Sequence, residues 1–127
     1  MIKEKITLEF ELKNVSLPML WTYISTPNGL CKWFCDDVSV EGKTHTFTWQ
    51  KMPQDADLIH FRQGSFVRFR WEEDEDTKYF FELKINTGEM SGEIELEITD
   101  FAFPEDIEDT KGLWKTQVES LKRSIGV

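Results

Sequence analysis

The sequence predicts an α+β fold in which a curved antiparallel sheet of about seven strands wraps around one long C-terminal helix. Three observations lead to this prediction. A clear strand pattern opens the chain, two short helical segments follow it directly, and the apolar spacing becomes helical only after residue 104. No linker-like, repetitive or low-complexity tract interrupts the 127 residues. We therefore expect one domain over residues 1–127.

The first strand and the two short helices are predicted within residues 6–34. One set of apolar residues alternates with polar ones, as in a strand with one buried face: Ile6, Leu8, Phe10 and Leu12. A first helical segment is expected over about residues 17–24. The second segment opens at Thr26 and Pro27, a capping residue followed by proline at the first helical position. We expect Trp33 and Phe34 at its end.

Six further strands are predicted by the same alternation. They centre on Val38/Val40, Phe47/Trp49, residues 58–61, Val67/Phe69/Trp71, Tyr79/Phe81/Leu83/Ile85 and Ile94/Leu96/Ile98. Turn signals separate them at residues 41–43, 52–55, 63–65, 72–76 and 86–88. Loops this short favour a mostly antiparallel meander.

The last segment has helical periodicity. Its apolar stripe consists of Ile107, Trp114, Val118, Leu121 and Ile125. Pro104 precedes it, acids occupy its first turn, and Lys122 and Arg123 occupy its last, which is the charge order that suits the helix dipole. We expect about 18 residues of helix, roughly 27 Å long. Gly112 inside it costs about 1 kcal/mol relative to alanine, so close packing or a kink is expected there.

Together these elements define a helix-grip architecture. The inner face of the bent sheet and the apolar stripe of the last helix face one another, and the two short helices close one end. A curved sheet that grips a single helix often leaves a gap along that helix, and this gap is the expected ligand site.

Charge excludes one class of function. The net charge of −9 is opposite to the basic patches that phosphate-backbone binding requires, so no nucleic-acid partner is expected. Acids gather in residues 72–76 and 105–109. We interpret these runs as a solvated turn and a helix N-terminus, because neither has a spacing that would bring its carboxylates together on a metal.

The chain shows no targeting or membrane signal. Its first ten residues contain no apolar stretch of signal-peptide length, and no apolar run approaches 18 residues. We therefore expect a cytoplasmic protein without stable membrane insertion. Its two cysteines are then reduced thiols.

No metal or cofactor is expected. Cys31 and Cys35 lie four residues apart, but a zinc site would need two more ligands from His45 and His60, which fall on different predicted strands. A disulfide between the two cysteines within a helix has poor geometry. We interpret both as passive thiols.

The orientation of His60 and Arg62 stays open. If Ile59 and Phe61 face the core, His60 and Arg62 face solvent; in the opposite register they form a polar pair inside the cavity. Arg68 and Arg70 alternate with apolar neighbours, so we expect them to face outward and balance nearby acids.

Motifs of common enzyme classes are missing from the sequence. There is no glycine-rich phosphate loop, no nucleophile elbow around a serine, and no His-Glu-x-x-His helix. We therefore name no catalytic residue and favour a non-enzymatic role.

Four groups of residues resemble the START-like (helix-grip, birch-pollen-allergen-like) superfamily, within it the branch related to the activator of the ninety-kilodalton heat-shock chaperone ATPase. They are Pro18/Trp21, Thr26/Pro27/Leu30/Trp33/Phe34, residues 67–71, and Trp114/Val118/Leu121. The resemblance covers the whole chain. It departs at Leu113, which separates Gly112 from Trp114, and in the long acidic run and the acidic outer face of the last strand. The superfamily includes small-molecule carriers, enzymes and chaperone cofactors, so membership implies the fold and leaves the function open.

The leading hypothesis is a binding module that encloses a small hydrophobic or amphipathic ligand between the sheet and the C-terminal helix. Its aromatic residues fill a solid core or line a hollow, and the sequence leaves both open. The expected walls are Trp49, Phe69, Trp71, Phe81, Trp114, Val118 and Leu121. The expected lid is Trp21, Trp33 and Phe34.

Two alternatives remain. The first is a protein-interaction module resembling the chaperone activators, whose acidic surface would suit a basic partner. The second is an enzyme acting on an apolar substrate in the same cavity, which would require His60 or an acid inside it with a perturbed pKa. The oligomeric state is left open, although we expect the glutamate-rich last strand to oppose pairing of strand edges. We expect Trp114 to point into the sheet; Leu113 and Gln117 would face inward if the helix were rotated.

Overall fold

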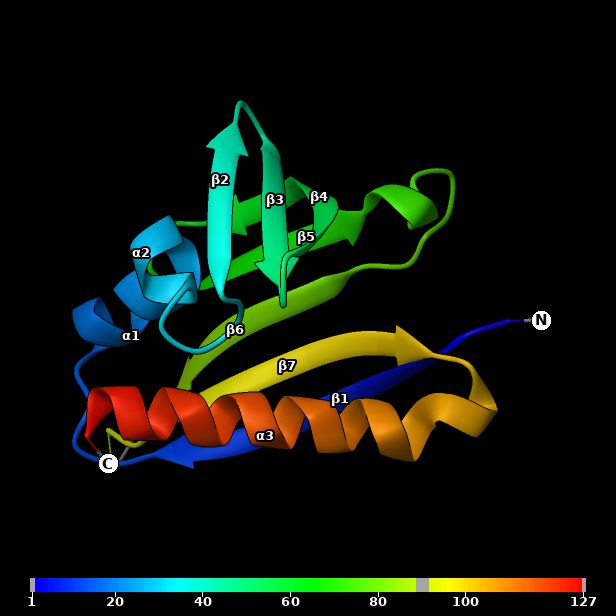
Figure 1. Cartoon of the computed structure of the whole chain (residues 1–127). Coiled ribbons are helices and arrows are strands. Elements are labelled where there is room, and N and C mark those ends of the chain that lie inside the picture. Colours follow the sequence, from blue (N-terminus) through cyan, green and yellow to red (C-terminus); the bar gives the residue numbers. More distant parts are fainter. Residues whose placement is uncertain (1, 89–91, 127) are drawn as a thin grey trace.

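A computed structural model describes residues 2–88 and 92–126 and contains one seven-stranded antiparallel sheet in the order β1-β7-β6-β5-β4-β3-β2 (Figure 1). The strands are β1 (Glu4–Leu12), β2 (Asp37–Glu41), β3 (Thr44–Trp49), β4 (Met52–Arg62), β5 (Phe66–Trp71), β6 (Phe81–Thr87) and β7 (Ile94–Ala102). The helices are α1 (Leu17–Ser25), α2 (Pro27–Leu30) and α3 (Ile107–Ile125), with short 3-10 turns η1 (Glu72–Asp74) and η2 (Pro104–Asp106). The predicted helix-grip fold is thereby confirmed.

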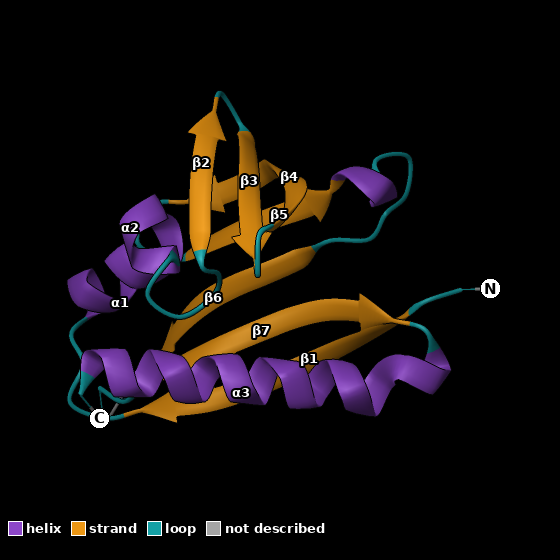
Figure 2. Cartoon of the chain, in the orientation of Figure 1, coloured by secondary structure: helices purple, strands orange, loops and turns teal. Residues whose placement is uncertain are grey.

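The helices occupy two places around the curved sheet (Figure 2). The long α3 runs beside β7 and β1, while α1 and α2 sit at one end, against β2, β5 and β6. The 19 residues of α3 agree closely with the predicted length, and its first and last turns carry the expected acids and bases.

The two short helices are set by their caps. The Ser16 hydroxyl accepts the Met19 N–H at the start of α1, and the Thr26 hydroxyl accepts the Gly29 N–H at the start of α2. The second helix is shorter than expected and ends at Leu30. Trp33 and Phe34 lie in the turn that follows, where the Phe34 N–H still reaches the Leu30 carbonyl at 2.8 Å.

Close packing at a glycine occurs in the short helices instead of in α3. A Cβ added to Gly29 would lie 2.1 Å from the Thr22 carbonyl oxygen, whereas one added to Gly112 would have no atom within 4 Å. The close packing expected at Gly112 is therefore wrong. Gly29 has the role instead, because it lets α2 approach the backbone of α1.

The β3–β4 connection differs from the prediction. The expected turn at 52–55 is part of β4, and the chain reverses at Gln50 and Lys51, both with positive φ (50° and 68°). Such a two-residue turn matches the twist of the flanking strands but normally contains glycine or asparagine, so its sequence signal is weak. Pro53 is tolerated because β5 pairs with β4 only from Ala56 onward, which leaves this part of β4 unpaired on one side.

The acidic outer face lies on a central strand. The order of strands places β7 between β1 and β6, and the edges are β1 and β2. The idea that glutamates on the last strand protect a sheet edge is therefore wrong. Sequence order alone does not show that β1 and β7, the first and last strands, pair in register from Glu4 opposite Ala102 to Leu12 opposite Ile94.

The far end of β4 settles the orientation of His60. A register irregularity between Leu58 and His60 interrupts the pairing with β5, and residues 59–62 are all exposed. His60 and Arg62 thus face solvent, but Ile59 and Phe61 do not enter the core as that register had required. The His60 ring packs edge-on against Phe66, with centroids 5.0 Å apart.

Arg68 and Arg70 bind partners beside their strand. Arg68 donates to one oxygen of Glu82 on β6 through Nε (3.1 Å) and a terminal nitrogen (3.0 Å), and its guanidinium lies over the Phe80 ring. Arg70 donates to the Tyr79 carbonyl at 2.8 Å. The expected charge balance therefore holds for Arg68, while Arg70 is satisfied by backbone.

Closely packed aromatic side chains form the core against the middle of the sheet. Phe47, Phe69 and Phe81 are fully buried and contact one another, with the Phe69 and Phe81 rings stacked at 5.2 Å. Trp114 points from α3 into this core at 5% exposure, whereas Leu113 is 61% exposed. The predicted rotation of the helix is therefore right.

Candidate ligand-binding site

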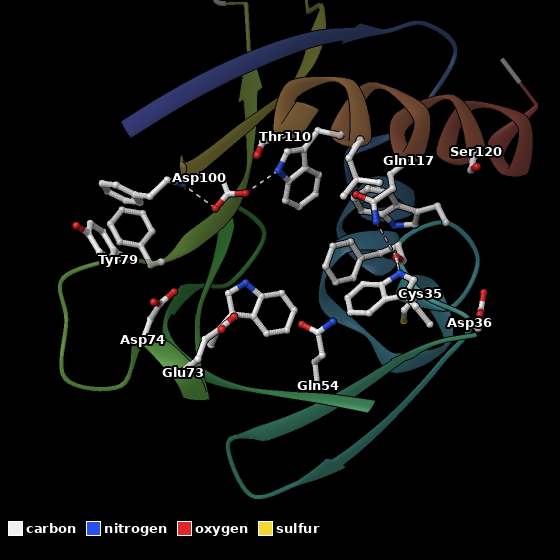
Figure 3. A pocket seen from close by; sticks show the side chains of 18 of the residues that line it. Cys35, Asp36, Gln54, Glu73, Asp74, Tyr79, Asp100, Thr110, Gln117 and Ser120 are labelled. Atoms are coloured by element: carbon white, nitrogen blue, oxygen red, sulfur yellow. Dashed lines mark hydrogen bonds between the residues drawn. The ribbon is translucent and has the colours of Figure 1, made fainter. Parts of the chain in front are cut away.

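A pocket of about 780 Å³ opens in front of this core, between α3 and the sheet (Figure 3). One side is the middle of α3, from Thr110 to Ser120. The other sides are the segment after α2, the ends of β3 and β5, the segment before β6, and the end of β7. This volume falls within the range that drug-sized ligands occupy.

Aromatic rings form the inner wall of the pocket. Its lining includes Phe34, Trp49, Trp71 and Trp114. Phe34 stacks on Trp114 with centroids 5.6 Å apart at an interplanar angle of 17°, and it meets Trp49 edge-on at 5.2 Å. Trp71 packs against Phe81, which belongs to the core behind. The wall is continuous with the core, so its rings are supported from behind.

The backbone of Phe34 holds the wall together. Its carbonyl oxygen accepts the indole N–H of Trp49 from β3 at 2.7 Å and the side-chain amide of Gln117 from α3 at 3.0 Å. One oxygen thus joins the segment after α2 to a strand and to the long helix. This arrangement uses both lone pairs of a carbonyl that would otherwise lie between apolar groups.

Asp100 supplies a carboxylate at the other end of the pocket. Its Oδ2 accepts the Trp114 indole N–H at 2.9 Å, and its Oδ1 accepts the Phe101 backbone N–H at 2.8 Å. Burial raises the pKa of this carboxyl group, while the two hydrogen bonds and the nearby Lys3 oppose the rise. No ion pair joins Asp100 to a cation among the described residues.

Lys3 lies at the same end of the pocket as Asp100, but it forms its ion pair with Asp74. The ammonium of Lys3 lies 3.4 Å from Asp74 Oδ1 and over the rings of Tyr79 and Phe103. Its backbone N–H donates to the Tyr79 hydroxyl at 2.9 Å. Asp74 is only 13% exposed, so the acidic run is not wholly solvated as expected.

The structure divides the predicted site residues into two groups. Trp49, Trp71, Trp114, Trp33 and Phe34 line the pocket. The remaining four wall candidates are buried in the core behind it and do not line the pocket: Phe69, Phe81, Val118 and Leu121. Trp21, half-buried on α1, is also outside the pocket lining.

Sequence reasoning missed Asp100. Ile94, Leu96 and Ile98 point to the core, and Asp100 is the next residue of the same alternation. An acid in that inward register was a usable signal, but the predicted strand stopped at Ile98. Gln117 was considered only for a rotated helix, yet it is half-buried and contacts the wall with Trp114 still inward.

The two cysteines lie at the opposite end of the lining. Both are free, and Cys35 is buried. Burial, followed by the neighbouring Cys31, raises the pKa of the Cys35 thiol to about 12. A thiol that stays protonated is a poor nucleophile, which fits the interpretation of Cys35 as passive.

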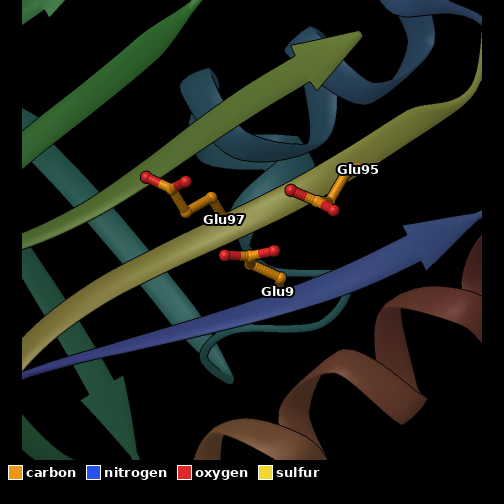
Figure 4. A group of neighbouring side chains, drawn as sticks. All are labelled: Glu9, Glu95 and Glu97. Atoms are coloured by element: carbon orange, nitrogen blue, oxygen red, sulfur yellow. The ribbon is translucent and has the colours of Figure 1, made fainter. Parts of the chain in front are cut away.

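A second cluster of acids lies outside the pocket, on the solvent face of the sheet (Figure 4). Carboxylate oxygens of Glu9, Glu95 and Glu97 all lie within 4.8 Å of one another, and the Asn86 amide donates to both Glu95 and Glu97. The acids were expected to face solvent. Glu9 of β1 joins these acids because β1 pairs with β7.

The fold and the pocket define a class of protein, the small helix-grip domains that present an aromatic-walled pocket between the sheet and the last helix. A profile of the START-like superfamily domain matches residues 1–127. The chain therefore belongs to the START-like superfamily, as its sequence motifs had indicated.

Solved structures agree with this assignment. The chain is similar to BfR322 from Bacteroides fragilis, with 44% identity, 98% of this chain and 93% of that chain covered, and a TM-score of 0.69. The Aha1 dimer from Colwellia psychrerythraea is 18% identical over 94% of this chain and 93% of its own, with a TM-score of 0.77. XoxI from Bacillus cereus is 16% identical over 94% of each chain, with a TM-score of 0.76.

The last two similarities concern the fold alone. No match was found among curated proteins. Within residues 2–88 and 92–126, no helix is long and apolar enough to cross a membrane.

Proposed function

We propose that this domain binds a small hydrophobic or amphipathic molecule in the pocket between α3 and the sheet. The main support is the pocket itself, about 780 Å³ with Phe34, Trp49, Trp71 and Trp114 in its lining. Apolar walls with a few placed polar groups are typical of small-molecule sites. We further propose a cytoplasmic location, because free thiols persist in a reducing compartment.

Within this proposal the predicted residues have two roles. Trp49, Trp71, Trp114 and Phe34 contact the ligand, and the buried Trp33 belongs to the same lining. Phe69, Phe81, Val118 and Leu121 support these rings from the core. Trp21 belongs to the helical end and does not touch the ligand.

Ligand-induced stabilisation tests the proposal. Native mass spectrometry of the purified protein and a thermal-shift screen of lipids and aromatic compounds would identify a ligand, whose binding raises the melting temperature in proportion to RT ln(1 + [L]/Kd). Trp71→Ala should weaken that shift. Trp21→Ala is the matched control, because it removes a half-buried tryptophan outside the pocket lining and should retain the shift. A pocket that neither retains nor binds any compound would overturn the proposal.

One observation favours the enzymatic alternative. Asp100 is an acid in the pocket wall, and its pKa is raised. Such an acid, inside the cavity and with a perturbed pKa, is what an enzyme acting on a bound substrate would require. A carboxyl group of this kind exchanges protons with a substrate when it lies within hydrogen-bond reach. Product formation from a bound ligand, abolished by Asp100→Asn with binding retained, would establish this role.

A different surface favours the interaction alternative. Ile59 and Phe61 are exposed apolar side chains at the irregular end of β4. Such side chains, with charges of both signs around Ile59, suit a protein partner that has an apolar centre and a charged rim. A partner recovered from lysate at low salt, and lost with Phe61→Ser, would support this role; retention by that variant would contradict it.

A further inference from the structure

We propose that the ligand of this pocket is a cation, an aromatic or amphipathic amine whose ammonium group binds the Asp100 carboxylate beside the tryptophan rings. This inference rests on the proposed ligand-binding function and names the chemical class of the ligand. It is based on the carboxylates of the pocket lining that form no ion pair among the described residues.

The charges of the lining are unequal. Among the described residues, the lining has four carboxylates, from Asp36, Glu73, Asp74 and Asp100, and two ammonium groups, from Lys3 and Lys32. Lys3 is paired with Asp74, and Lys32 extends over the Tyr23 ring on α1. The excess of negative charge, in a chain of net charge −9, favours a positive ligand over a neutral or anionic one.

Asp100 has acceptor capacity left for such a ligand. Each of its oxygens accepts one hydrogen bond from the protein, from Trp114 to Oδ2 and from Phe101 to Oδ1. A carboxylate has about four lone-pair sites, so both oxygens can accept another donor. The two N–H groups also fix the orientation of the carboxylate before a ligand arrives, which lowers the cost of binding.

The surrounding rings suit the same charge. Trp114 directs its indole N–H edge at Asp100 and stacks on Phe34. The rings that remain for a cation are therefore those of Trp49 and Trp71, which line the same pocket. Tryptophan faces attract cations more strongly than those of other side chains, and the effect grows when water is excluded. Burial is the main cause of the raised pKa of Asp100 and Lys3 opposes the rise only in part, so an ammonium group bound to this carboxylate would lower the pKa further.

Three probes with one ring system and different charges test the proposal: 2-(2-naphthyl)ethylamine, 2-(2-naphthyl)ethanol and 2-naphthylacetate. Titration into ¹⁵N-labelled protein, followed through the indole N–H resonances of Trp49, Trp71 and Trp114, gives each dissociation constant. We expect the amine to bind about tenfold more tightly than the alcohol, because its hydrogen bond is charge-assisted. The carboxylate should bind most weakly.

Two variants locate the preference. Asp100→Asn should remove the advantage of the amine while the affinity for the alcohol changes less than about twofold. Glu72→Gln is the matched control, since it removes an exposed carboxylate outside this lining and should leave the advantage in place. If Asp100→Asn does not fold, the ranking of the three probes on the unchanged protein decides alone.

The outcomes separate the two proposals. Equal binding of the three probes, or tightest binding of the carboxylate, would overturn the cationic ligand and leave the pocket as a binding site. An amine preference that survives Asp100→Asn would also overturn it. If none of the probes shifts an indole resonance, this class of ligand is excluded, whereas the ligand screen described above judges the binding function separately.

Discussion

The indole N–H of Trp114 donates to the carboxylate of Asp100, with 2.9 Å between Nε1 and Oδ2. The bond joins the long helix to the end of β7, and both residues line the pocket. Trp114 is therefore at once the anchor of α3 on the sheet and the donor that orients the acid of the site.

Trp114→Ala should lower the free energy of unfolding by about 3–5 kcal/mol, because it removes a buried ring and takes from Asp100 Oδ2 the indole N–H that donates to it. Chemical denaturation with an unchanged m-value would measure the loss. Trp114→Phe keeps a buried aromatic ring but loses the N–H and part of the indole, so it should cost less than the alanine variant. A loss below about 1 kcal/mol for the alanine variant would show that the ring is not an anchor.

Gly29→Ala should destabilise the domain by about 1–3 kcal/mol, since its Cβ would meet the backbone of α1 at Thr22 and Tyr23. Gly112→Ala makes the same chemical change in open space on α3 and should stabilise by up to about 1 kcal/mol. Thermal unfolding of the two variants compares them directly. Equal effects would show that α2 has room to move away from α1.

Acid should destabilise the domain through His45. Its ring is buried beside Phe69, and burial lowers its pKa below 6.5 despite the Lys43 carbonyl and Asp57. Between that lowered value and 6.5 the unfolded chain binds more protons, so the free energy of unfolding falls as pH drops through this window. His45→Gln should reduce that slope, and an unchanged slope in this variant would contradict the prediction. Asp100 acts in the opposite sense near its own titration, because its pKa is raised in the folded state.

Glu9→Gln should stabilise the sheet by about 0.2–1 kcal/mol, because Glu9 on the edge strand β1 lies directly opposite Glu97 in the β1–β7 register. The gain should shrink as salt screens the repulsion. Glu41→Gln serves as control, since Glu41 pairs with Thr44. A gain that does not depend on salt would assign the effect to something other than charge.

The fold could be predicted from this sequence because its signals are local. The alternation in β1 and β7, the caps at Ser16 and Thr26, and the apolar stripe of α3 each act within a few residues. Where local signals are weak the prediction failed. The turn at Gln50 and Lys51 has positive φ without glycine, and β4 extends through Pro53 because only one neighbour pairs there.

The site was only partly predictable. The large aromatic side chains at inward positions could be recognised from the sequence. The sequence does not show which of them line the pocket and which are buried in the core: Trp71 lines the pocket, while Phe69, two residues earlier, is in the core. The polar end depends on long-range pairing. Lys3 meets Asp74 across 71 positions of sequence, and no local pattern indicates that contact.

The attachment of Lys3 to Asp74 and Tyr79 places the beginning of the chain on the rim of the pocket. The described C-terminal residues lie at the opposite end of α3 (Figure 1). An affinity tag or fluorescent protein fused before residue 2 would therefore stand beside the entrance and compete with the molecules being assayed. Fusions for ligand screening should be made after α3, and an N-terminal tag should be cleaved before any affinity is measured.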